Sequence, residues 1–165
     1  MAVPPTEQNA PAARPFTAFN FKVLIELKDV DGVSNPICGA AFSDCDGLEV
    51  ILEPKTIREG GRNTGPVHLA GPMSYGQLSL KRGMTNSFDL WRWFQKLATP
   101  GQGGYRTSAT VVMLAADRSE QAVFELTGCL PVKLKAPVLN AKDGIVAVEE
   151  MQIAYESLRL KPATT

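Results

Sequence analysis

The stretch FNFKVLIELK, residues 19–28, sets the structural class of this chain. Alternate positions of this stretch are apolar, and the positions between them are mostly polar. One face would therefore carry Phe19, Phe21, Val23, Ile25 and Leu27. A period of two residues is typical of a strand that buries one face and exposes the other. The stretch predicts a half-buried β-strand at the start of the folded body.

Further strands are predicted along the chain, between turn residues. The Asp-Gly pairs at 31–32 and 46–47 mark turns. In the final strand the apolar residues change phase, which predicts a β-bulge near Glu156. The segments with strand character are 37–42, 48–53, 75–82, 107–115, 122–127, 130–135 and 145–160. This gives seven or eight antiparallel strands.

One helix is predicted between these strands. Asn86 can cap its start, and the charge of Asp89 favours a helix N-terminus. Pro100-Gly101 ends it. The apolar stripe at helical spacing consists of Leu90, Trp91, Phe94, Leu97 and Ala98. We therefore expect a mainly β fold: an antiparallel two-sheet β-barrel or sandwich with one flanking α-helix.

Two aromatic residues fall outside the centre of the helical stripe. Phe88 and Trp93 would then lie nearer the edge of the helix, while Leu90, Trp91 and Phe94 seat it on the sheet. Apolar anchors carry much of the energy of protein association. Phe88 and Trp93 are therefore our candidates for contacts between subunits.

Residues 54–74 show no clear periodicity and are rich in glycine and proline. A segment of this length without secondary structure is uncommon in a compact domain, and such loops are usually functional or ordered by a partner. We expect a long loop that projects from the body.

The chain is expected to hold one domain, over residues 16–161. Residues 1–15 are rich in proline and alanine and predict a flexible arm. The alternative is an extended arm that becomes ordered on a partner.

Charge and composition exclude several classes of function. Lys and Arg number 17, and so do Asp and Glu, so the net charge is zero and no overall field draws the chain to DNA or an anionic membrane. No apolar run reaches the length of a membrane span, and the first residues lack the features of a secretory signal. We expect a protein assembled in the cytoplasm, with Cys38, Cys45 and Cys129 as free thiols.

No set of residues in the sequence predicts catalysis, a metal site or a cofactor. The one histidine, His68, has no nucleophile placed beside it by any pattern. The cysteines lack the close pairs of zinc sites, and Asp44-Cys45-Asp46-Gly47 lacks the distal carboxylate of a calcium loop. The basic residues form no dense stripe with aromatics, so no sequence-specific nucleic-acid binding is expected.

Several phrases of the chain together resemble a known family. They include Phe42-x-x-Cys45-x-Gly47-Leu48-x-Val50, the turn at residues 58–61 (REGG), and LKRGMT (80–85) before the Trp-containing helix. A proline-lysine segment (residues 131–137) and Leu139-Asn140-Ala141 precede the final strand. In order and spacing these are similar to the tail tube proteins of contractile phages and phage-derived contractile injection systems. The resemblance covers roughly residues 19–160.

The resemblance implies a fold like that of the type VI secretion tube protein, Hcp. It also implies a structural, non-enzymatic subunit that forms hexameric rings, and the rings stack into a hollow tube inside a contractile sheath. The implied partners are further copies of the chain, the sheath protein, and the baseplate, initiator and terminator proteins of the particle. The alternatives are a tube initiator or baseplate adaptor of the same fold, or a binding module carried in the particle.

Two sets of contact residues follow if the chain builds a tube. The tip of the projecting segment would contact the neighbouring ring, through Ile57, Arg58, Glu59, Gly60, Gly61, Arg62 and Asn63. The polar faces of two strands would line the wet channel, because a strand with one buried face shows the other to water. Those lumen candidates are Lys22, Glu26, Gln77, Ser79 and Lys81.

Overall fold

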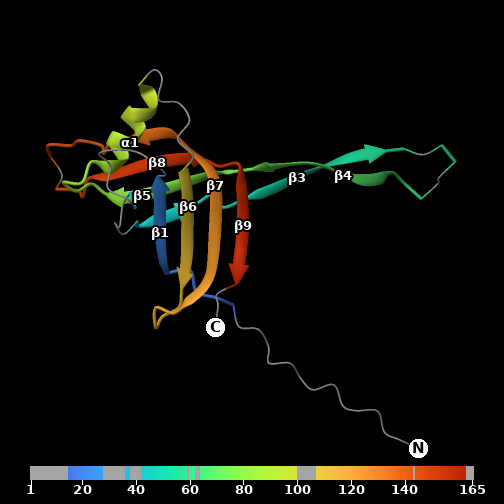
Figure 1. The fold of residues 1–165 in the computed structure, drawn as a ribbon, viewed down its shortest axis with the longest axis horizontal. Coiled ribbons are helices and arrows are strands. Elements are labelled where there is room, and N and C mark those ends of the chain that lie inside the picture. The colour runs from blue at the N-terminus through green and yellow to red at the C-terminus, as the bar shows by residue number, and fades with distance from the viewer. Residues whose placement is uncertain are drawn as a thin grey trace, which may run out of the picture.

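The computed structural model describes residues 15–27, 36–37, 42–58, 60–61, 64–99, 107–142 and 144–162. In this part of the chain nine strands and one helix follow one another (Figure 1). They are β1 (Asn20–Leu27), β2 (Asp44–Asp46), β3 (Val50–Ile57), β4 (Val67–Tyr75), β5 (Gln77–Gly83), α1 (Asp89–Ala98), β6 (Thr107–Leu114), β7 (Glu120–Lys135), β8 (Val148–Ala154) and β9 (Ser157–Pro162).

Strand β7 connects the two layers of the main sheet. Its first half pairs with β6 and β9, and its second half pairs with β8. Gly128 lies between the halves with a φ of +64°, a backbone conformation that glycine adopts without strain. The sequence predicted two strands here, 122–127 and 130–135. The structure has one bent strand instead, because Gly128 turns the backbone without ending the pairing.

The main sheet is antiparallel and has the order β1-β6-β7-β8-β5-β2, with β9 also paired to β7. One layer is therefore β1-β6-β7-β9, and the other is β7-β8-β5-β2. Among the described residues β1 and β2 do not pair, so this sheet does not close into a barrel. The expected mainly β sandwich with one helix is confirmed, in its open form.

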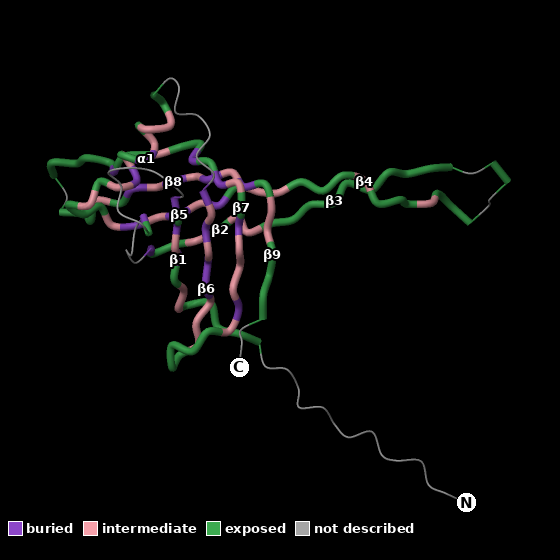
Figure 2. Tube along the Cα trace, in the orientation of Figure 1, coloured by how far each residue is buried: buried purple, intermediate pink, exposed green. Residues whose placement is uncertain are grey.

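The core lies between the two layers and is built by alternate residues of their strands. Val23 and Ile25 of β1 face Leu78 and Leu80 of β5 across it, all at most 2% exposed. Burial of one such side chain contributes roughly 1.5–3 kcal/mol. Figure 2 shows this burial concentrated in the sandwich. The strand predicted from residues 19–28 is confirmed as β1, although Phe19 lies before it and is exposed.

Helix α1 begins later than predicted, at Asp89. Phe88 occupies the N-cap position without a side-chain hydrogen bond, so Asn86 is not the cap. The carbonyl of Ser87 accepts a hydrogen bond from Arg82 at 3.1 Å, which holds the chain outside the helix at that point. Asp89 lies in the first turn, where its charge favours the helix N-terminus.

A buried ion pair ties the helix to the sheet. Arg82 of β5 donates through Nε to Oε1 of Glu149 of β8 at 2.5 Å, and both side chains are 1% exposed. Trp91 Nε1 donates to the other carboxylate oxygen of Glu149 at 3.0 Å. The sequence pattern gave no sign of this network, because it joins residues that are 58 and 67 positions apart.

Most of the predicted loop at residues 54–74 is in fact a β-hairpin. Strands β3 and β4 form a separate two-stranded sheet that extends far from the sandwich (Figure 1). Each residue of β3 is exposed. No face of the hairpin is buried in the chain. Its apolar residues therefore need not all lie on one face, and the sequence shows no period of two.

The C-terminal strand of the sequence prediction, 145–160, is two strands. β8 pairs with β5 and β7, and β9 returns to pair with the first half of β7. The backbone N–H of Glu156 donates to the carbonyl of Thr127 at 2.9 Å at the corner between them. The phase change near Glu156 therefore marks a corner between layers instead of a β-bulge.

Some predicted features lie outside the described residues. These are the arm up to residue 14, the turn at 31–32, Cys38 and the Pro100-Gly101 pair after α1. Of the strand predicted at 37–42, Ile37 forms an isolated bridge to Ile25, and residues 38–41 are not described.

Candidate assembly interface

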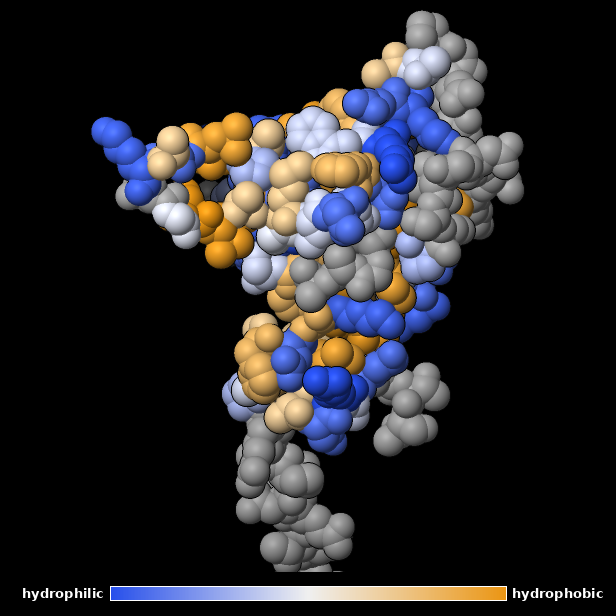
Figure 3. Space-filling view, turned by 90° about the vertical axis from the view of Figure 1, so that its left-hand side faces the viewer, coloured by the Kyte–Doolittle hydropathy of each residue, from blue (hydrophilic) through white to orange (hydrophobic). Residues whose placement is uncertain are grey.

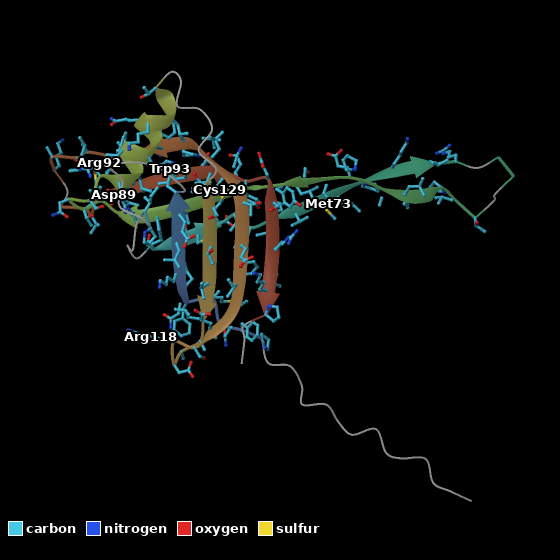
Figure 4. The ribbon with its side chains drawn as sticks, in the orientation of Figure 1. Met73, Asp89, Arg92, Trp93, Arg118 and Cys129 are labelled. Atoms are coloured by element: carbon cyan, nitrogen blue, oxygen red, sulfur yellow. The ribbon has the colours of Figure 1, made fainter. Side chains whose placement is uncertain are left out.

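The projecting hairpin exposes large apolar side chains on both of its faces. Residues directly opposite in an antiparallel pair share a face. Leu52 is opposite Met73, and Val50 is opposite Tyr75. Val50, Leu52 and Met73 are 48%, 45% and 63% exposed, and we call these three residues the root patch. Figure 4 places Met73 well away from Trp93 and Cys129 in the sandwich.

A second apolar group lies further out and on the other face. Ile57 is opposite Val67, and Lys55 is opposite Leu69. Ile57 and Leu69 are 39% and 46% exposed, and Val67 is half-buried. Ile57, Val67 and Leu69 form the outer patch. Odd-numbered residues of β3 point to one face and even-numbered ones to the other, so the two patches lie on opposite faces.

A bulge in β4 produces this change of face. The register passes from Leu52 opposite Met73 to Pro54 opposite Ala70, which gives β4 one extra residue. Gly71 lies in the bulge, where an added Cβ would be 2.0 Å from the Glu53 carbonyl oxygen. Only glycine fits without a backbone shift. Without the bulge, Leu69 would share the face of Met73.

The root of the hairpin is fixed to the core by one tyrosine. The hydroxyl of Tyr155, a residue 6% exposed, accepts a hydrogen bond from the N–H of Glu49 at 2.9 Å. It donates towards the carbonyl of Gly47 at 2.8 Å. Its ring packs against Tyr75 with centroids 5.8 Å apart. The hairpin therefore leaves the sandwich in a defined direction.

The predicted turn at Asp46-Gly47 is confirmed at the start of this root. Gly47 has a φ of +88°, and its N–H is bonded to Oδ1 of Asp46 at 2.7 Å. An added Cβ would lie 1.9 Å from the carbonyl oxygen of Gln77. This position requires glycine for both conformation and space.

The opposite end of the molecule carries a further apolar surface. The segment between β7 and β8 lies away from the hairpin (Figure 1), and we call its residues 136–142 and 144–147 the apolar loop. Its residues line an open hollow of about 400 Å³. Hydrophobic side chains gather at this end in Figure 3. Those exposed are Val138 (69%), Leu139 (89%), Ile145 (59%) and Val146 (78%).

The predicted tip residues are only partly described. Ile57 ends β3, Arg58 follows it, and Gly60 and Gly61 form an exposed turn. Glu59, Arg62 and Asn63 lie outside the described residues. The contact of this tip with a neighbouring copy stays a prediction.

The structure separates the two aromatic candidates for subunit contacts. Phe88 is 45% exposed and remains available. Trp93 is 1% exposed and belongs to the core cluster, so its predicted position at the edge of the helix is wrong. Leu90 and Trp93 are the buried residues of α1, whereas Trp91 and Phe94 are half-buried. The helix is apolar on more than one stripe, and the packing of the sandwich selects the stripe with Trp93.

The lumen candidates divide between the two layers. Lys22 and Glu26 are exposed on β1, and Gln77, Ser79 and Lys81 are exposed or half-buried on β5. Both strands turn their apolar residues to the same core, so their polar faces point away from it on opposite sides. Lys81 also pairs with Asp44 of β2 at 3.1 Å, and this hydrogen bond raises the pKa of Lys81. The wall of a single channel would therefore carry either the residues on β1 or those on β5, but not both.

The titratable groups of the described residues form no reactive site. His68 is exposed on the hairpin, with its Nδ1 3.1 Å from the Thr56 hydroxyl. Burial raises the pKa of the Cys45 thiol to about 11, with contributions from Asp44 and Asp46, and burial also raises that of Cys129 to about 11. Both thiols are free. Within the described ranges, no group of three His, Cys, Asp or Glu residues could hold a metal ion, and no helix is long and apolar enough to cross a membrane.

Sequence reasoning missed most of the apolar surface. It selected the charged and glycine tip at residues 57–63, yet Leu52 and Met73, at 45% and 63%, are more exposed than Ile57 of that tip, at 39%. It also missed the apolar loop. The composition of these segments could have indicated the exposed apolar surface, because their large apolar residues stand beside glycine and proline, where a chain seldom buries them. The open sandwich and its unpaired apolar ribbon are those of a structural subunit that associates with other molecules.

Comparison with known proteins agrees with this class. The family model for the T4-like virus tail tube protein gp19 matches residues 17–159, so the chain belongs to that family. The resemblance drawn from the sequence is confirmed, and the family's role is structural. No curated protein matches the chain in sequence.

Solved structures share the fold. A chain of the anti-feeding prophage (AFP) baseplate has a TM-score of 0.78 and 24% identity, over 93% of this chain and 99% of that one. A chain of the sheath-tube complex of an extracellular contractile injection system, PVC, has a TM-score of 0.73 and 14% identity, over 92% and 95%. A chain of the AFP tube-terminating cap has a TM-score of 0.74 and 12% identity, over 98% and 100%.

Proposed function

We propose that this chain is the protomer of the inner tube of a contractile phage tail or contractile injection system, and that it forms hexameric rings that stack around a hollow lumen. The observation that carries the proposal is the projecting hairpin. A two-stranded ribbon is at best marginally stable alone in water, and this one exposes apolar residues on both faces. Such a ribbon gains a stable environment when other copies cover it. Membership of the tail tube family supports the same conclusion.

Ring formation would use the free edges of the layer β1-β6-β7-β9. Within the described part of the chain, β9 pairs only with β7, and the outer edge of β1 holds one bridge, from Ile25 to Ile37. A layer with an open edge on each side can continue into a neighbour on both sides by strand pairing. Its polar face would then form the inner wall of the ring. Of the lumen candidates, we place Lys22 and Glu26 on this wall.

The partners follow from the position of a tube. The tip at residues 57–63 would contact the neighbouring ring, and Phe88 remains a candidate for contacts between subunits. A sheath would surround the tube, with baseplate or initiator proteins at one end and a terminator at the other. Structures similar in fold come from a sheath-tube complex, a baseplate and a tube-terminating cap. The particle would assemble in the cytoplasm, and we propose no enzymatic activity for the chain.

The decisive experiment is electron microscopy of the purified chain and of a deletion of residues 57–68. The deletion removes only the outer end of the hairpin, so its circular dichroism and melting temperature should match those of the intact monomer. We expect tubes from the intact chain and none from the deletion. Tubes of normal length from the deletion would overturn the role of the tip. A monomer under all conditions would overturn the tube itself and favour a binding module.

A tube initiator is the second candidate, because a chain of a baseplate shares the fold. Initiators and tube proteins differ in whether rings of one chain stack on themselves. Long filaments from the purified chain would identify the main tube protein. Single rings that remain unstacked at high concentration would identify the initiator.

A further inference from the structure

The two apolar patches of the hairpin cannot be covered by one flat surface. The root patch and the outer patch lie on opposite faces of a ribbon that is one layer thick. The outer patch also lies further along the ribbon, because five residues from Leu52 to Ile57 span roughly 17 Å at about 3.3 Å per residue. Ile51, which is 41% exposed and opposite Ser74, extends the apolar surface of that face towards the root. A surface that covers one patch leaves the other in water.

Local structure keeps the two patches on opposite faces. The bulge at Gly71 changes the face of β4 between Met73 and Leu69. The close approach of Gly71 to the Glu53 carbonyl admits no side chain. The Tyr155 hydroxyl holds the root of the ribbon on the core. The ribbon is therefore a directed element, with one contact surface near its own sandwich and another beyond it.

The molecule also carries a second exposed apolar surface, which could cover the outer patch of another copy. The apolar loop lies at the end away from the hairpin and exposes Val138, Leu139, Ile145 and Val146. Of these, Val138, Leu139 and Ile145 line its hollow. Contacts between unlike surfaces at two ends of one chain are heterologous, and they propagate through copies of that chain. Family membership indicates that the partner on these surfaces is another copy of the chain, since a tail tube is built from repeated copies of its protein.

We propose that each hairpin is held between two other copies of the chain, with the root patch against one copy and the outer patch seated on the apolar loop of another. This inference rests on the proposed function. It adds that one hairpin joins three molecules, so that removal of either patch alone breaks assembly. The root patch contacts the nearer copy, because it lies close to its own sandwich.

Photo-crosslinking tests the number of copies. A photoreactive amino acid replaces Met73, Leu69 or both, and these chains are assembled with a large excess of unlabelled chain. Each single label should give crosslinked dimers, and the double label should give trimers. Mass spectrometry should locate the crosslink from position 69 within residues 136–147. Tubes with a double label that stops at dimers, or with the position 69 crosslink elsewhere, would overturn the inference and leave the proposed function intact.

Paired substitutions test the two patches separately. Leu52→Ser with Met73→Ser removes two of the three apolar side chains of the root patch. Ile57→Ser with Leu69→Ser does the same for the outer patch. Each pair should reduce the yield of tubes about tenfold or more without lowering the melting temperature of the monomer. Thr56→Ala, on the polar part of the ribbon, is the matched control and should assemble normally. Normal tubes from either pair would show that its patch has no partner. Absence of tubes from the intact chain would instead refute the proposed function.

Discussion

Leu80 and Leu52 are both leucines in strands of this protein, but their surroundings are opposite. Leu80 of β5 is 1% exposed in the sandwich core, whereas Leu52 of β3 is 45% exposed on the hairpin. The sandwich buries its apolar residues within the chain. The hairpin does not, and we propose that other copies of the chain cover it. Substitutions in the sandwich should therefore act on folding, and substitutions on the hairpin should act on assembly.

The largest effect is expected at Trp93, which the sequence assigned to the interface and the structure assigns to the core. Trp93→Ala should lower the free energy of unfolding of the monomer by about 3–5 kcal/mol, the usual result of truncating a buried aromatic. Small domains hold about 5–15 kcal/mol in total. Urea unfolding of the monomer measures the loss.

Two variants control this result. Phe88→Ala removes an exposed aromatic next to the same helix and should change monomer stability by no more than about 0.5 kcal/mol. Trp93→Phe should be much milder than Trp93→Ala, because Trp93 Nε1 has no hydrogen-bond partner among the described residues. Equal losses for Trp93→Ala and Phe88→Ala would remove the distinction between core and edge.

The next effect concerns the ion pair that joins the sandwich to α1. Arg82→Met leaves the buried Glu149 carboxylate with Trp91 as a donor but without its cation. Loss of one partner of a buried pair costs roughly 3 kcal/mol or more. Urea unfolding should show this loss, and the double variant Arg82→Met with Glu149→Met should recover most of it. A double variant as unstable as the single one would mean that the guanidinium acts chiefly through Ser87.

Sequence patterns predicted the sandwich better than the hairpin, and the reason is burial. The alternation in residues 19–28 and 107–115 exists because one face of each strand enters the core. Residues 54–74 gave no such pattern, because neither face of the hairpin is buried within the chain. The two apolar patches do form a pattern, since they lie on opposite faces with the bulge at Gly71 between them. This pattern can be recognised only once the register of β3 and β4 is known.

The errors in the helix and in the long strands have a similar origin. Trp93 and Phe94 each lie three or four residues from both Leu90 and Leu97, so local spacing does not choose between them. In the structure the indole N–H of Trp91 is bonded to Glu149 and Trp93 is buried in the core, and both features depend on contacts that are distant in the sequence. Likewise, glycine at position 128 indicates a break in a strand, whereas here it bends one continuous strand between two layers.

A smaller effect is expected where the two regions join. Tyr155→Phe removes the hydroxyl that bonds to the backbone of Gly47 and Glu49. Leaving such groups unsatisfied costs about 1–2 kcal/mol. We expect a modest fall in the melting temperature and a larger fall in tube yield, because the hairpin loses its direction. Tyr75→Phe is the control, since its hydroxyl lies outside this network. Full assembly by Tyr155→Phe would show that the hairpin is oriented by its partners alone.

The smallest effect concerns the reactivity of thiols in the two regions. Met73→Cys places a thiol on the exposed root patch, and Cys129 is 2% exposed in the core. Burial raises the pKa of Cys129 to about 11, so about one molecule in ten thousand carries the thiolate at neutral pH. Because thiolate is the reactive form, an alkylating reagent should label Met73→Cys rapidly and Cys129 very slowly in the folded monomer. Cys38→Ser in every variant removes the thiol outside the described residues. Because the folded state holds the Cys129 proton more tightly, this contribution to stability is present near neutral pH and is lost as the pH rises through about 11.

In assembled tubes, labelling at position 73 should become slow while that of Cys129 stays as it was. Rapid labelling at position 73 in tubes would mean that the root patch remains in water, and that the hairpin and the sandwich do not differ in what covers them.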